Sequence, residues 1–188
     1  YRKFAVLLLV SMIPTALLGY TARRLVVLAA DSVLIPSAGL LVTGIVLLVI
    51  DLARTGGTKA AKDANLSDAM WIGLCQGISV FPGLSRSGLT ISAGLMSGFS
   101  RTFAVKYSYI LSIPAIIGSL IMELGQFGSP AMTVGLGFAY VLGMIVSGVT
   151  AFFVIRYCLK LVHKGRFRVF AIYCFVIGLV TLIINHML

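Results

Sequence analysis

An arginine in the middle of a long apolar stretch is the feature that most constrains this chain. Arg86 lies in the segment FPGLSRSGLT, residues 81–90, and apolar residues run from Ala69 to Phe81 and from Leu89 to Phe99. An arginine near the centre of a bilayer costs roughly 2.5–3.5 kcal/mol on insertion scales. We therefore expect Arg86 to have a partner or a function.

The composition indicates an integral membrane protein. Of the 188 residues, 60% are hydrophobic and 11% are charged, which is far from the composition of a soluble domain. The formal net charge of +10 would favour a nucleic-acid partner in a soluble protein. Here the basic residues lie in short segments between apolar runs and no nucleic-acid-binding motif accompanies them. We expect the lipid bilayer as the environment and no nucleic-acid partner.

Five apolar runs are long enough to cross the roughly 30 Å hydrocarbon core of a bilayer as helices. They cover residues 4–20, 33–52, 108–124, 131–155 and 169–184. The sequence thus predicts an all-α integral membrane protein, a polytopic helical bundle that forms a single membrane domain over residues 1–188.

The central segment, residues 68–99, is expected to form a re-entrant helix hairpin. Its arms, 68–81 and 87–99, would be about 21 and about 20 Å long as helices, which is too short to cross. Pro82-Gly83 favours a chain reversal between them. Broken backbone at this depth is tolerated where it is buried in protein or lines a wet cavity.

The distribution of basic residues supports the hairpin. If the five runs cross and the hairpin does not, Arg23 and Arg24 lie on one side of the membrane, and Arg86 lies at the hairpin tip. The other side, which is expected to be cytoplasmic, then holds Arg2, Lys3, Arg54, Lys59, Lys62, Arg101, Lys106, Arg156, Lys160, Lys164, Arg166 and Arg168. A full crossing by residues 68–99 would remove this asymmetry.

The residues around Arg86 suit an anion. Ser87 is a candidate N-cap for the second arm, and the free N–H groups of that helix end, with Gly88 allowing close approach, would bind negative charge. An arginine fork beside hydroxyl groups can bind two oxygens of a phosphate. Half-helix N-termini at mid-membrane depth also hold anionic substrates in transporters. The residues alone predict a phosphate or small-anion site, without choosing between binding and cleavage.

Two alternatives concern single residues. Arg86 could pair with a carboxylate elsewhere in the bundle and serve structure only, although the Pro-Gly turn and the neighbouring hydroxyl groups favour the anion site. Gln76 lies one helical turn before the tip and either packs between helices or lines the site.

The motif resembles the signature of the undecaprenyl-diphosphate phosphatase family, also called the bacitracin-resistance protein family. Gln76-Gly77 followed by PGLSRSGLTI, residues 82–91, fits the family pattern PGxSRSGxT, and the stretch from Ser100 to Pro114 resembles the segment that follows. With the order of the spans, the resemblance covers the whole chain. It implies an inverted-repeat architecture, in which each half has a re-entrant hairpin and three spans and the hairpin tips meet at the site.

The resemblance implies an enzyme that hydrolyses undecaprenyl diphosphate to undecaprenyl phosphate and phosphate. That reaction recycles the lipid carrier for peptidoglycan synthesis in the bacterial inner membrane and confers bacitracin resistance. Arg86 would neutralise the diphosphate, the hydroxyl groups would hydrogen-bond phosphate oxygens, and the glycines would shape the loop. The matching positions are the catalytic candidates Arg86, Ser85 and Thr90 and the substrate-binding candidates Ser87, Gly83, Gly88 and Gln76.

The chain resembles the family from its second span onward, and the family's first hairpin and first span have no match here. The family's first hairpin carries a pair of glutamates and a Pro-x-Ser-Ser-x-Gly-His stretch, which would supply the ligands of a divalent cation, Mg²⁺ or Ca²⁺, and the nucleophile. Phosphoryl transfer needs charge neutralisation and a positioned nucleophile together. We expect no metal ligands in this chain, and we expect the isolated chain to be inactive or nearly so.

A polyprenyl-phosphate carrier or flippase is the alternative function. It would use the same anion site without hydrolysis, because a helix end at mid-depth and an inverted repeat are also transporter features. A purely structural membrane protein is the third interpretation. The sequence leaves a monomer and a homo-oligomer both open.

Overall fold

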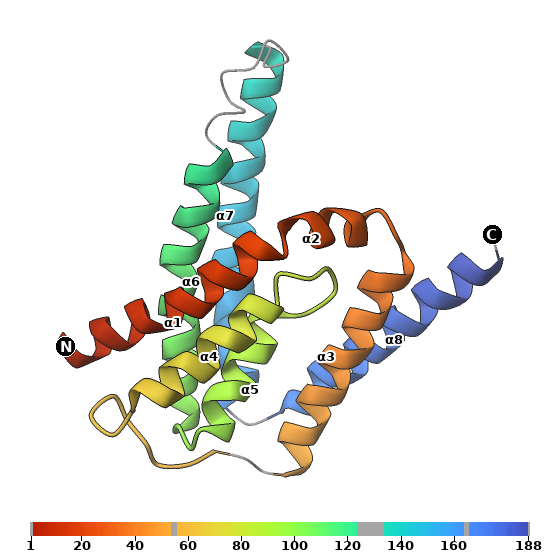
Figure 1. Ribbon diagram of the computed structural model, residues 1–188. Coiled ribbons are helices and arrows are strands. Elements are labelled where there is room, and N and C mark those ends of the chain that lie inside the picture. Colours follow the sequence, from red (N-terminus) through yellow and green to blue (C-terminus); the bar gives the residue numbers. More distant parts are fainter. Residues whose placement is uncertain (1, 54–55, 124–133, 164–165, 188) are drawn as a thin grey trace.

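The computed structural model describes residues 2–53, 56–123, 134–163 and 166–187 (Figure 1). Within these ranges the chain is helical and forms no β-strand; a single isolated β-bridge joins Lys59 and Phe99. The helices are α1 (Arg2–Thr21), α2 (Arg23–Ala30), α3 (Leu34–Leu52), α4 (Leu66–Ile78), α5 (Arg86–Met96), α6 (Arg101–Glu123), α7 (Val134–His163) and α8 (Phe167–Met187). The predicted all-α class is confirmed.

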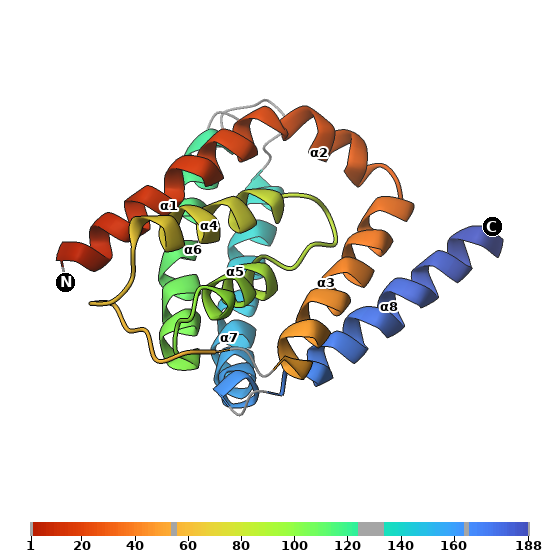
Figure 2. The ribbon, with the colours of Figure 1, turned by 60° about the horizontal axis from the view of Figure 1, so that its bottom comes forward.

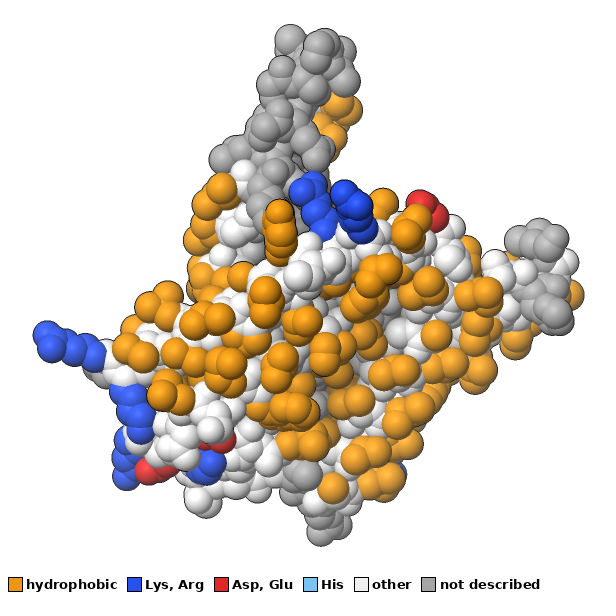
Figure 3. Space-filling model, viewed as in Figure 1, with side chains coloured by type: hydrophobic (Ala, Val, Ile, Leu, Met, Phe, Trp, Pro, Cys, Tyr) orange, Lys and Arg blue, Asp and Glu red, His pale blue; other side chains and the backbone are white. Residues whose placement is uncertain are grey.

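Five helices, α1, α3, α6, α7 and α8, are long and apolar enough to cross a membrane. Each predicted apolar run overlaps one of them, although residues 124 and 131–133 lie outside the described ranges. Hydrophobic side chains are spread over the face seen in Figure 3, as expected where lipid takes the place of water. The chain is a polytopic membrane protein.

The segment after α1 is helical, whereas the sequence analysis placed no element between the first two runs. Residues 23–30, RRLVVLAA, contain neither Gly nor Pro, so nothing interrupts a helix before Asp31. Figures 1 and 2 show that α2 continues the direction of α1 towards α3, which then runs back beside α8. The three helices surround the central hairpin on two sides.

The central segment consists of two short helices joined by a loop. α4 has 13 residues and α5 has 11, so they are about 20 and about 17 Å long and neither can cross a bilayer. α4 begins after Asn65, which forms a reciprocal capping box with Asp68. The hairpin is present in the structure, and its re-entrant placement in a bilayer stays a prediction.

The first arm packs against α1 through its glycines. A Cβ atom at Gly73 would overlap the carbonyl oxygen of Ser11, and one at Gly77 would lie 2.7 Å from Leu18 Cδ1. Small residues at this spacing let two helix backbones approach closely. Ser11 also joins α1 to α6, because its Oγ lies 2.7 Å from the hydroxyl oxygen of Tyr107.

Several basic segments meet at one end of the bundle. Lys3 Nζ donates to the carbonyl oxygen of Lys62, and backbone hydrogen bonds of 3.1 and 3.0 Å join Lys59 to Gly98 and Ser100. Arg168 forms an ion pair of 3.3 Å with Asp51 at the junction of α3 and α8. These contacts bring four of the segments that the charge count assigns to one side of the membrane to the same end of the fold.

Candidate anion-binding site

The loop between α4 and α5 is held against α3, towards which it extends in Figures 1 and 2. Gly83 has a φ of +85°, a conformation that favours glycine, and a Cβ atom there would overlap the carbonyl oxygen of Pro36. On α3, a Cβ atom at Gly39 would lie 2.5 Å from the carbonyl oxygen of Pro82. Glycine at both positions therefore lets the loop and α3 touch through their backbones, and the predicted turn at Pro82-Gly83 is confirmed.

Thr43 of α3 fixes the end of this loop. Its Oγ1 accepts a hydrogen bond of 3.0 Å from the N–H of Ser85 and donates one of 3.3 Å to the carbonyl oxygen of Gly83. The side chain is 1% exposed. This role of Thr43 could not be predicted from the sequence, because an isolated threonine in an apolar run carries no local signal of a partner some 40 residues away.

Ser85 is the N-cap of α5, so the expectation that Ser87 caps this helix is wrong. Ser85 has extended backbone, and its Oγ accepts a hydrogen bond of 3.1 Å from the N–H of Gly88. The helix starts two residues earlier than expected because this bond is completed by the hydroxyl group preceding Arg86. The N–H groups of Arg86 and Ser87 in the first turn have no hydrogen-bond partner among the described residues, as is usual at a helix N-terminus.

Arg86 faces a cavity of about 540 Å³ between α1, the end of α4 and α6. The walls are mostly apolar, with Met12, Ala16, Val80 and Ala115 among the lining residues. The polar lining residues are Thr15, Tyr20, Arg23, Gln76, Ser79, Arg86 and Ser119. Two of these are cations and none is an acid, so the cavity is positively charged.

Two polar atoms beside this cavity are buried without a partner. They are Nη2 of Arg86 and Oε1 of Gln76. The ion pairs found in the described ranges join Lys59 to Asp68 and Arg168 to Asp51, and neither involves Arg86. A buried guanidinium nitrogen without an acceptor is costly unless a ligand supplies one. The purely structural interpretation requires a carboxylate that pairs with Arg86, and no such carboxylate lies among the described residues.

The predicted site residues divide into three groups. Arg86 and Gln76 line the cavity together. Ser85, Gly83 and Gly88 build the turn and cap that position Arg86, and at Gly88 a Cβ atom would lie 3.0 Å from Ser85 Oγ.

Ser87 and Thr90 form the third group, which lies outside the cavity lining. Ser87 is exposed. Thr90 is 2% exposed; its hydroxyl group donates to the carbonyl oxygen of Arg86 at 2.8 Å and lies 2.6 Å from Ser108 Oγ on α6. The roles expected from the resemblance, substrate binding for Ser87 and catalysis for Thr90, stay predictions.

A divalent cation does not fit the described residues. No group of three or more His, Cys, Asp or Glu side chains in the described ranges could hold a metal ion. Phosphate chemistry with a hard cation calls for carboxylate oxygens, and no acid lines the Arg86 cavity. A metal ion in this cavity would therefore need ligands other than the described residues.

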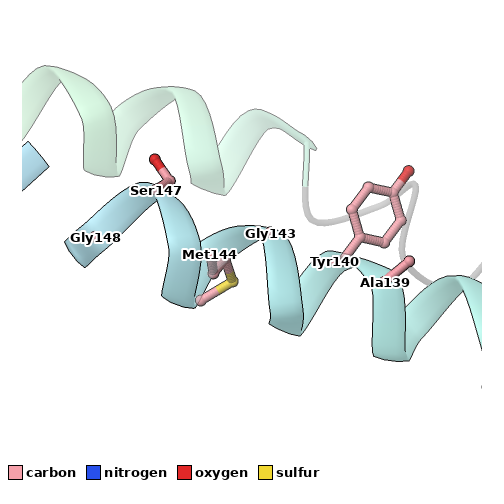
Figure 4. A pocket seen from close by; sticks show the side chains of 6 residues that line it. All are labelled: Ala139, Tyr140, Gly143, Met144, Ser147 and Gly148. Atoms are coloured by element: carbon pink, nitrogen blue, oxygen red, sulfur yellow. The ribbon is translucent and has the colours of Figure 1, made fainter. Parts of the chain in front are cut away.

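A second hollow lies on the surface of α7 and differs in character. Figure 4 shows its lining residues, Ala139, Tyr140, Gly143, Met144, Ser147 and Gly148, all on one helix. The lining contains no charged side chain, and no residue of the span Gly135–Tyr157 is buried. Such a face is ordinary for a helix that contacts lipid, so Arg86 marks the better candidate site.

These features define a class: a polytopic membrane protein that presents an arginine, at the start of a short helix, in a largely apolar cavity. The model of the bacitracin resistance protein BacA family matches residues 1–180. The chain belongs to this family.

Similar proteins described as undecaprenyl-diphosphatase occur in several organisms. The chain is 40% identical over 185 residues to that of Desulforapulum autotrophicum, covering 96% of this chain and 64% of the relative. The corresponding protein of Methanosphaera stadtmanae is 33% identical, with 100% of this chain and 66% of the relative covered, and that of Korarchaeum cryptofilum is 37% identical, with 96% and 66% covered. The chain thus spans somewhat less than two thirds of the length of the curated relatives it matches.

Proposed function

We propose that this chain carries the arginine part of the active site of an undecaprenyl-diphosphatase. The observation that carries the proposal is that Nη2 of Arg86, at the start of α5, is buried without a partner while the residue lines a cavity inside the helix bundle. The relatives' description as undecaprenyl-diphosphatases supports the choice of substrate. The complete protein would recycle the lipid carrier for peptidoglycan synthesis and thereby confer bacitracin resistance.

The local chemistry suits a phosphoryl group. The Arg86 fork can bind two phosphate oxygens, and it extends from the first turn of α5, at the positive end of the helix dipole. Ser85 Oγ already accepts from Gly88, so its hydrogen remains to donate to a phosphate oxygen. In the overall reaction the bond between the terminal phosphorus and the bridging oxygen breaks, and a water oxygen completes the released phosphate. Arg86 would stabilise the charge that develops on the phosphoryl oxygens.

The cavity also suits a lipid-linked substrate. Apolar side chains from α1, α4 and α6 form most of its walls, while Arg23 and Arg86 supply positive charge. Arg23 belongs to the side of the membrane that is poor in basic residues. With the basic end of the bundle cytoplasmic, the cavity would be reached from the opposite face of the plasma membrane.

The nucleophile and any divalent cation are proposed to come from residues other than those described here. No His, Asp or Glu lines the cavity, so the described part provides no base that could activate Ser85. For this reason the chain by itself is expected to release little or no phosphate. A homo-oligomer stays a prediction.

A carrier for polyprenyl phosphate remains the second candidate, because the same cavity could bind the headgroup without cleaving it. Phosphate release from undecaprenyl diphosphate separates the two. The assay compares this chain with a form that is extended by upstream sequence to the length of the relatives. Each of the two proteins is measured without a substitution and with Arg86→Ala. Arg24→Ala is the matched control, since Arg24 is exposed and lies outside the cavity lining.

The enzyme proposal expects release by the extended form, a loss of at least about 100-fold with Arg86→Ala, and no change with Arg24→Ala. Binding of the lipid without any release by the extended form would contradict hydrolysis and favour the carrier.

A further inference from the structure

Gln76 lines the Arg86 cavity and has an unfilled hydrogen-bond acceptor. The residue lies in the last turns of α4, is 2% exposed and lines the cavity together with Arg86. Its Oε1 is buried and has no partner among the described residues. Buried side-chain oxygens of this kind are rare in folded proteins and call for an explanation.

Thr15 fixes which end of the Gln76 amide is left over. Thr15 Oγ1 lies 2.8 Å from the carbonyl oxygen of Ser11 and 3.0 Å from that of Gly73. Both are acceptors, so the single hydroxyl hydrogen is directed at the backbone and the Thr15 oxygen can only accept. It accepts from Gln76 Nε2 at 3.3 Å. The amide nitrogen therefore belongs on the Thr15 side, and the carbonyl end is the one without a partner.

An acceptor and an arginine on residues that line the same cavity limit which protonation state of an anion can use both. A fully ionised phosphoryl group has only acceptor oxygens, which Oε1 would repel. A phosphoryl group that retains one proton can donate its O–H to Oε1 while its charged oxygens bind Arg86. Phosphate monoesters lose their second proton with a pKa of about 6, so the protonated form is available close to neutral pH.

We propose that Gln76 is a specificity residue that selects a protonated phosphoryl group, accepting its O–H at Oε1 while Arg86 binds the charged oxygens. The inference rests on the proposed function only in taking a phosphoryl group as the ligand. In this proposal Gln76 recognises the proton on the phosphoryl group, and Arg86 binds the negatively charged oxygens.

Inorganic phosphate and sulfate test this directly. The two anions have similar size and shape, but at neutral pH phosphate retains an O–H group and sulfate has none. The affinity of the purified chain for each is measured in detergent, for the wild type and for Gln76→Leu. We expect the wild type to bind phosphate about tenfold more tightly than sulfate, and Gln76→Leu to remove this preference by weakening phosphate binding alone.

Ser92→Ala is the matched control. Ser92 Oγ is also buried without a described partner, but Ser92 lies outside the cavity lining. Its replacement should leave both affinities unchanged. A second pair of variants tests the same point without changing Gln76. Thr15→Val removes the acceptor of Gln76 Nε2, so the Gln76 amide can rotate and the preference for phosphate over sulfate should weaken. Thr15→Ser keeps the hydroxyl group and should keep the preference.

Two outcomes would overturn the inference. In the first, Gln76→Leu weakens both anions equally; in the second, it changes neither affinity. Arg86→Ala separates this inference from the proposed function. It should weaken both anions, and if it weakens neither, the anion site itself is wrong whatever Gln76 does.

Discussion

Thr43 and Ser85 join the third helix to the first turn of the fifth, because the Ser85 N–H donates to Thr43 Oγ1 at 3.0 Å. The same hydroxyl group donates to the carbonyl oxygen of Gly83. One buried side chain thus holds both ends of the turn that precedes Arg86. The position of the arginine depends on a residue that is far from it in the sequence.

We expect Thr43→Val to weaken binding of inorganic pyrophosphate by about tenfold and to lower the free energy of unfolding by about 1–3 kcal/mol. Valine keeps the shape but leaves the partly buried Ser85 N–H without its acceptor. Thr43→Ser should retain binding. Titration calorimetry and thermal unfolding of the purified chain measure both quantities.

The control for Thr43 is Thr181→Val. Thr181 Oγ1 accepts from Ser37 Oγ at 2.8 Å where α3 meets α8, so this change also removes a hydroxyl contact of α3. It should affect stability and leave pyrophosphate binding intact. If Thr43→Val binds pyrophosphate like the wild type, Thr43 does not position the site.

Replacing Gly83 by alanine should displace the loop. The residue has a φ of +85° and its added methyl group would overlap the carbonyl oxygen of Pro36. We expect Gly83→Ala to weaken pyrophosphate binding at least tenfold, because the loop must leave α3 to relieve the overlap. Gly143→Ala is the control, since a Cβ atom there meets nothing within 4 Å. Equal binding by the two variants would show that the contact with α3 is not needed.

The sequence predicted the membrane class, the helix hairpin and the Pro82-Gly83 turn, because apolar runs, arm lengths and a Pro-Gly pair are local signals. It placed the cap of α5 at Ser87, since several hydroxyl groups surround Arg86 and the chain alone does not show which one reaches the N–H of Gly88. The roles of Thr43 and Thr15 could not be predicted. Each depends on a contact between helices that are far apart in the sequence.

Arg23 and Arg24 should differ although they are neighbours. Arg23 lines the cavity that contains Arg86, whereas Arg24 does not. A diphosphate carries more charge than one guanidinium can balance, so we expect Arg23→Ala to weaken pyrophosphate more than phosphate, by about threefold to tenfold. Arg24→Ala should change neither affinity. The same loss with both variants would indicate a general effect of surface charge instead.

Thr90 and Ser108 should act as a pair in folding. Their hydroxyl oxygens are 2.6 Å apart and both side chains are buried, at 2% and 5% exposure. We expect Thr90→Val and Ser108→Ala each to destabilise the fold by about 1–2 kcal/mol. The double variant should cost less than the sum, because the second change removes a group already left without its partner. Strict additivity in thermal or denaturant unfolding would contradict the pairing.

The central claim is that Arg86 binds the phosphate groups of a lipid diphosphate inside the membrane bundle. The most direct test is the affinity of the purified chain for undecaprenyl diphosphate in detergent, compared among the wild type, Arg86→Lys and Arg86→Ala. We predict a loss of at least about 30-fold with alanine and an intermediate loss with lysine, which keeps the charge but not the two-pronged geometry. Affinity that is unchanged in Arg86→Ala, in a protein that still folds, would contradict the claim.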